Sequence, residues 1–75
     1  MDKQSQKEFL VKFGVNLRKV RLEKGFTQEQ LANELGVEVS QISRIERGII
    51  STSVIMLYSI SNVLEVNVSR FFDLE

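Results

Sequence analysis

The stretch that decides the fold of this 75-residue chain is Thr27–Gly48, which reads TQEQLANELGVEVSQISRIERG. It opens with a helix-start pattern, because Thr27 can accept a hydrogen bond from the Gln30 amide while the Gln30 side chain reaches back to the Thr27 amide. Gly36 then follows an apolar face of helical spacing, and glycine takes the left-handed conformation that ends a helix without a Cβ penalty. The pattern predicts a short helix that ends before Gly36.

A second helix follows after a turn of only two residues. Val39, Ile42 and Ile45 recur at the spacing of one helix face, and Gly48 ends this helix. Two helices of about eight residues joined so closely must cross steeply, as in the helix-turn-helix motif, whose second helix enters the major groove of DNA. With the isoleucines inward, the outward side chains are Val39, Ser40, Gln41, Ser43, Arg44 and Arg47.

The rest of the chain predicts three more helices. Ser5 with Glu8 has the spacing of another capping box, and the helix that it opens is expected to run to about Lys24. Further helices are expected from the cap Ser53 through Leu64, and over roughly Val68–Phe72. No segment alternates with period two for long enough to indicate a sheet. We therefore predict an all-α domain of five helices.

These segments resemble the Cro and phage-repressor type of helix-turn-helix domain, also called the xenobiotic-response-element type. The resemblance is carried by TQEQLA, the Gly36 turn and ISRIERG, by FGVNLRKVRLEKGFTQ as a first helix, and by SVIMLYSISNVLEV as a fourth. It covers residues 9–72, and the chain looks most like small restriction–modification controller proteins. It implies a single compact five-helix domain over residues 1–75, with the motif at 27–48.

The composition argues against catalysis. Without cysteine or histidine, the chain lacks disulfides, thiolate metal sites and the commonest general base. No phosphate loop or nucleophile system is recognisable, and so small a domain has little room for a ligand pocket. We expect no enzymatic activity, cofactor, metal or small-molecule ligand. With no signal peptide and no long apolar run, we also expect no membrane association and a cytoplasmic location.

The charge of the chain is zero overall but unevenly distributed. From Lys7 to Lys24 there are six basic and two acidic residues, whereas from Gly48 to the end there are one basic and three acidic residues. A basic N-terminal part and an acidic C-terminal part can orient a domain on DNA. The alternative is a solvated helix face, which composition alone would favour.

The candidates for base contacts are outward residues of the second motif helix and the residue before it. Arg44 can pair with O6 and N7 of guanine, Ser40 with most base edges, and Val39 with a thymine methyl group. Ser40 and Arg44 are four residues apart and share a face. Glu38 can accept from a cytosine amine, or can act as an N-cap in place of the better Ser, Thr or Asp usual in the family.

The candidates for DNA backbone contacts surround that helix. Gln28 can donate to a phosphate beside the free amides of a helix N-terminus, as the resemblance implies, or can be an exposed glutamine that helps the cap. The further candidates are Ser43, Arg47, Ser51 and Thr52. The resemblance also implies that Arg21 and Glu46 pair with each other, as structural residues rather than as DNA contacts.

The predicted function is sequence-specific binding of double-stranded DNA by a transcriptional regulator. We expect a homodimer on a palindromic operator, with helix 39–47 in the major groove. The dimer contact is expected on the apolar C-terminal surface, about residues 54–75, from Val68, Phe72 and Ile55. The alternatives are that these residues only close the core, or that the chain is a protein-interaction module such as an antitoxin-like partner.

Overall fold

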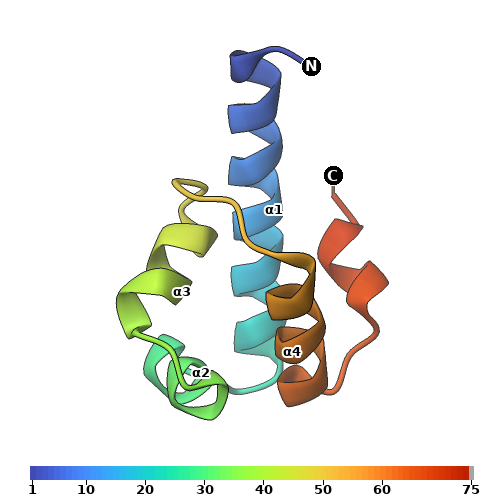
Figure 1. Ribbon diagram of the computed structural model, residues 1–75. Helices are drawn as coiled ribbons and strands as arrows, with labels where there is room; N and C mark the ends of the chain where they lie inside the picture. Colours follow the sequence, from blue (N-terminus) through green and yellow to red (C-terminus); the bar gives the residue numbers. More distant parts are fainter. Residues whose placement is uncertain (75) are drawn as a thin grey trace.

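The structure, a computed structural model, describes residues 1–74 and contains only helices. In chain order they are α1 (Lys3–Glu23), α2 (Gln28–Leu35), α3 (Val39–Glu46), α4 (Val54–Leu64) and the 3-10 helix η1 (Val68–Phe72) (Figure 1). The all-α prediction is confirmed, but four α-helices and a 3-10 helix replace the five helices expected. The last element is only five residues long, and short helical pieces are commonly of the 3-10 type.

The first helix starts earlier than the predicted cap at Ser5. Asp2 is the N-cap, and its Oδ1 accepts a hydrogen bond from the Ser5 amide over 2.7 Å. The predicted cap position is therefore wrong by three residues, and aspartate is as good an N-cap as serine. The hydrogen bonds from Ser5 favour the charged carboxylate and lower the pKa of Asp2 below its ordinary value.

The core lies between α1 and the elements that wrap around it. Phe13, Leu17 and Val20 form the buried face of α1. The other elements contribute Leu31, Ala32, Ile42, Ile45, Leu57, Ile60, Leu64 and Phe71. In Figure 1, α2 and α3 lie on one side of α1, α4 lies in front of it, and the first turns of α1 project beyond the other elements. None of the helices in residues 1–74 is long and apolar enough to cross a membrane.

Gly14 allows α1 and the end of α3 to meet at backbone distance. A Cβ atom at this position would overlap the carbonyl oxygens of Ile45 and Glu46. Three residues earlier, Val11 contacts Gly48, where a Cβ would lie 2.7 Å from the Val11 Cα. The glycine inside α1, which costs about 1 kcal/mol of helix propensity relative to alanine, is therefore required by the close packing of the motif.

Candidate nucleic-acid interface

The helix that begins the motif is capped as the sequence predicts. The Gln30 amide donates to Thr27 Oγ1 over 3.0 Å, and the Thr27 amide donates to Gln30 Oε1 over 2.9 Å. At the other end, Gly36 has φ of 71° and its amide bonds back to carbonyls of the last turn. These local bonds set the bounds of α2, and hence the direction in which the chain enters α3.

The recognition-type helix α3 has a bare N-terminus. Glu38 occupies the N-cap position, but its side chain makes no capping hydrogen bond. It is exposed, and Val39 and Ser40 beside it are also exposed. The side chain of Glu38 is therefore available to another partner, and the first amides of α3 lack a side-chain cap.

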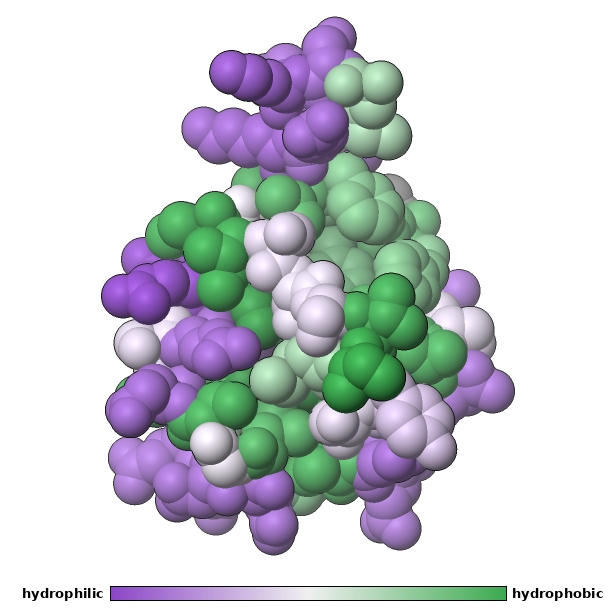
Figure 2. Space-filling view, in the orientation of Figure 1, coloured by the Kyte–Doolittle hydropathy of each residue, from purple (hydrophilic) through white to green (hydrophobic). Residues whose placement is uncertain are grey.

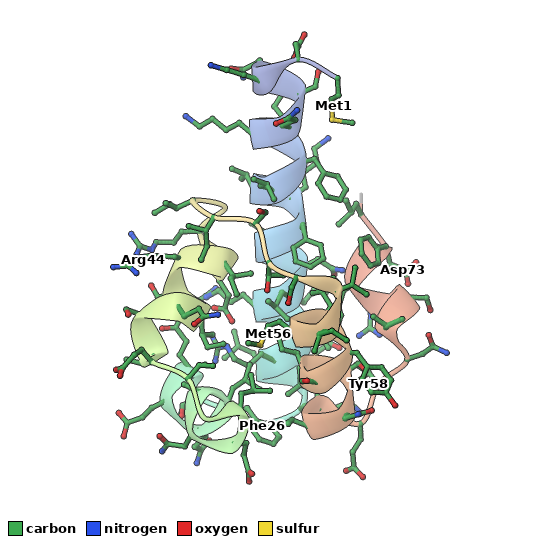
Figure 3. All side chains as sticks on the ribbon, viewed as in Figure 1. Met1, Phe26, Arg44, Met56, Tyr58 and Asp73 are labelled. Atoms are coloured by element: carbon green, nitrogen blue, oxygen red, sulfur yellow. The ribbon has the colours of Figure 1, made fainter. Side chains whose placement is uncertain are left out.

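The four candidates for base contacts lie on the surface at the start and outer side of α3. The opposite face of the helix buries Ile42 and Ile45 completely or nearly so. Arg44 lies one turn beyond Ser40 and projects away from the protein (Figure 3). An exposed carboxylate, a small apolar group, a hydroxyl and an arginine thus follow one another along the surface of α3, from its N-cap to its last turn.

The candidates for backbone contacts fall into two groups. Arg47 Nε donates to Ser43 Oγ over 3.1 Å, which holds the arginine along the outer side of α3 and leaves its other N–H groups available. Ser51 and Thr52 follow α3 in the loop, where they line an apolar cavity of about 220 Å³ together with Phe9 and Phe72. Their role in DNA binding stays a prediction.

A buried ion pair joins the motif to α1. Arg21 Nε and Nη2 donate to the two carboxylate oxygens of Glu46, over 2.6 and 3.0 Å, and Arg21 Nη1 donates to the Phe26 carbonyl over 2.7 Å. Both residues of the pair are about 95% buried, with 4% and 5% exposed. Such a pair with every polar atom bonded fixes the position of α3 on α1, and it is inaccessible to DNA.

Gln28 joins the same network, a contact that the sequence reasoning missed. Its Nε2 donates to Glu46 Oε1 over 2.9 Å, although the two residues lie 18 positions apart. No local pattern in the sequence signals this pairing. The half-buried Gln28 amide keeps a second N–H, at the N-terminus of α2.

An apolar surface lies over α4 and η1, which are on the right in Figure 3, whereas Arg44 projects to the left. Val54 and Ile55 of α4 are 80% and 74% exposed, and Phe72 of η1 is 49% exposed. Val68 and Tyr58 are exposed as well. Phe71, by contrast, is completely buried in the core. This surface, over α4 and η1, is more apolar than a solvated helix pair requires.

Residues 17–71 match the model of the family described as helix-turn-helix. The chain belongs to this helix-turn-helix family. The matched segment begins within α1, contains the whole motif and α4, and ends one residue before the end of η1.

Two kinds of relative are similar to this chain. The HTH-type transcriptional regulator SlrR of Bacillus subtilis (strain 168) is 43% identical over 60 residues, a match that covers 79% of this chain and 40% of SlrR. The chain thus spans about two fifths of the length of that relative. The restriction–modification controller protein C.AhdI of Aeromonas hydrophila superposes with a TM-score of 0.80 at 35% identity, over 84% of this chain and 96% of that one.

The structure of another controller protein has been determined in complex with DNA. C.Esp1396I, as a tetramer in complex with its natural 35 base-pair operator, superposes with a TM-score of 0.74 at 38% identity. The match covers 87% of this chain and 86% of that one. The resemblance to phage-repressor-type domains and to controller proteins, expected from the sequence, is confirmed.

Proposed function

We propose that this protein is a transcription regulator that binds a palindromic operator in double-stranded DNA as a homodimer, with α3 in the major groove. The observation that carries the proposal is the division of α3 into two faces. One face packs Ile42 and Ile45 into the core, while Arg44 and Ser40 stand free on the other. A helix whose buried face is fixed in the core, and whose exposed face carries unpaired polar groups, is suited to reading base edges.

The roles of the side chains follow from their chemistry. Arg44 reads guanine through O6 and N7, and each such bidentate contact discriminates by about 1–3 kcal/mol. Gln28 donates its second N–H to a phosphate at the start of α2, where the helix dipole also attracts the anion. Ser43 and Arg47 contact the DNA backbone on the other side of the major groove. Glu38, uncommitted as a cap, accepts from a cytosine amine.

Two copies are needed because one helix reads only a few base pairs. A chain of zero net charge also gains little from the general attraction of phosphates. A two-fold dimer on half-sites about 34–36 Å apart doubles the contacts. Ile55, Val68 and Phe72 supply the dimer contact from the apolar surface over α4 and η1. The complex of the C.Esp1396I tetramer with its operator supports binding of DNA by more than one copy.

The regulated genes are, on this proposal, those of a restriction–modification system, and the protein acts in the cytoplasm. The likeness to the controller proteins C.AhdI and C.Esp1396I, at TM-scores of 0.80 and 0.78, supports this choice. No metal-binding group of three or more acidic, histidine or cysteine side chains occurs in the described part of the chain.

Selection of duplexes by the purified full chain from a random library tests the proposal. The expected result is an enriched palindrome whose binding weakens as salt rises, because phosphate contacts release counterions. Failure to enrich any sequence, together with salt-independent or absent binding, would overturn it. That result would favour the protein-interaction module, for which the exposed Val54, Ile55 and Tyr58 offer a contact surface.

A further inference from the structure

We propose that Lys3 and Lys7, on the projecting start of α1 (residues 3–9), bind DNA phosphates. These phosphates flank the base pairs that α3 contacts. The inference rests on the proposed function and extends its binding surface. This start of α1 lies outside the segment that matches the family model, which begins at residue 17. It is nonetheless helical and projects beyond the packed elements in Figure 1.

The helical phase of α1 directs both lysines toward the α3 side. Successive residues of an α-helix turn by about 100°, so Lys3, Lys7 and Gly14 lie within about 40° of one another around the axis. Gly14 is the residue whose missing side chain admits the carbonyls of Ile45 and Glu46. Lys7 and Lys3 therefore lie on the same side of α1, about 10 and 16 Å further along it.

The depth of the major groove brings phosphates within reach of that side. A recognition helix sits in a groove about 8.5 Å deep, while packed helices are about 8–10 Å apart. Because these two distances are similar, the phosphates at the rim of the groove lie almost as deep in the complex as the axis of α1. Beyond the end of α3, the loop of residues 47–53 lies beside α1, and the start of α1 projects past that loop (Figure 1).

The basic and acidic side chains at the start of α1 lie on different faces of the helix. Glu8 lies about 100–140° away from the two lysines around the helix and accepts a hydrogen bond from Gln4, while Asp2 is occupied as the N-cap. Within residues 1–74 the ion pairs are Arg21–Glu46 and Arg70–Glu23, so neither lysine is neutralised by one of them. Figure 2 shows mostly hydrophilic side chains over the start of α1, and a mixture of hydrophilic and apolar side chains over the side where α3 lies.

The test compares two double variants with the same loss of charge. The first is Lys3→Gln with Lys7→Gln. The control is Lys12→Gln with Lys19→Gln, because those lysines lie about 140–160° away from Gly14 and line a cavity beside Asp73. Binding of each full-length variant to the duplex selected from the library is measured over a range of salt concentrations. Melting temperatures of all variants check that folding is unchanged.

We expect the first variant to flatten the plot of log binding constant against log salt concentration by roughly 2–4, since each phosphate contact contributes about 0.9 to the slope and a homodimer carries four of these lysines. Hydroxyl-radical footprints should lose protection at backbone positions outside the bases read by α3. The control should keep both the slope and the footprint of the unmutated protein.

Three other outcomes separate the possible failures. An unchanged slope and footprint in the first variant would overturn the inference and leave the proposed function standing. An equal change in both variants would also overturn it, because it would reflect total charge rather than position. Absence of any duplex binding by the unmutated protein would overturn the proposed function and the inference that rests on it.

Discussion

The side-chain amide of Gln28, at the start of α2, donates to Glu46 Oε1 at the end of α3 over 2.9 Å. A carboxylate only accepts hydrogen bonds, so this contact holds the NH₂ end of the amide toward Glu46 and rules out the flipped arrangement. The same carboxylate is bound by Arg21 from α1. One buried group therefore joins all three helices of the DNA-binding half and orients the residue proposed to contact a phosphate.

The first prediction concerns this buried carboxylate. Glu46→Ala leaves the buried guanidinium of Arg21 without its partner, which typically costs about 3–5 kcal/mol of the free energy of unfolding. A domain of this size has little stability to spare, so the variant should be largely unfolded or melt much earlier. Urea unfolding followed by circular dichroism measures the change.

The matched control replaces both members of the ion pair. Arg21→Met with Glu46→Leu removes the two charges together and should destabilise far less than Glu46→Ala alone. If Glu46→Ala keeps the unfolding midpoint of the unmutated protein, the pair does not stabilise the fold.

The second prediction distinguishes a residue that contacts bases, Arg44, from one that contacts phosphates, Gln28. Arg44→Ala should cost about 1–3 kcal/mol on the selected operator and relax the preference at one base pair, because a bidentate guanine contact is lost. Gln28→Ala should instead weaken binding to operator and to unrelated duplex alike. Titration of both variants against the operator and its single-base-pair substitutions gives the answer. An equal loss for Arg44→Ala on every sequence would assign Arg44 to the DNA backbone.

The third prediction exploits the bare N-terminus of α3. Glu38→Ser supplies a side-chain cap that the natural residue does not provide, and should raise the free energy of unfolding by about 0.5–2 kcal/mol. Thermal and urea unfolding measure the gain. Operator binding by the same variant should fall if Glu38 accepts from a base. A variant that is no more stable would show that the free amides of α3 are already satisfied by water.

The fourth prediction concerns the apolar surface over α4 and η1. The unmutated protein should be a dimer at tens of micromolar, and Val68→Asp should make it a monomer by burying a charge at the proposed contact. Sedimentation or light scattering distinguishes the two states. Ser69→Asp, on an exposed neighbour in the same element, is a control for added charge. Monomers in both proteins, or a dimeric Val68→Asp, would refute this interface.

Much of the DNA-binding motif could be predicted from the sequence because its signals are local. The capping box of Thr27 and Gln30 and the left-handed Gly36 depend on bonds between residues at most a few positions apart. The apolar spacing of Ile42 and Ile45 likewise reveals which face of α3 is buried. Once these are known, the outward set that includes Arg44 follows from helix geometry.

Local signals were insufficient at the two ends of the chain. The spacing of Ser5 and Glu8 predicted a helix cap at Ser5. The structure uses Asp2, which adds nearly a turn to α1. The short last helix was placed correctly, but its 3-10 type was not foreseen because five residues carry too little periodicity to distinguish the two kinds of turn.

Periodicity and caps in the sequence thus determined the all-α class, the position of the motif and the outward face of α3. Only the tertiary structure decided which distant groups meet. Gln28 reaches Glu46 across 18 residues, and Gly14 brings α1 into backbone contact with the end of α3, which sets the direction of Lys3 and Lys7. The physical reason is that caps and helix faces depend on neighbours along the chain, whereas these contacts depend on how whole helices cross and pack.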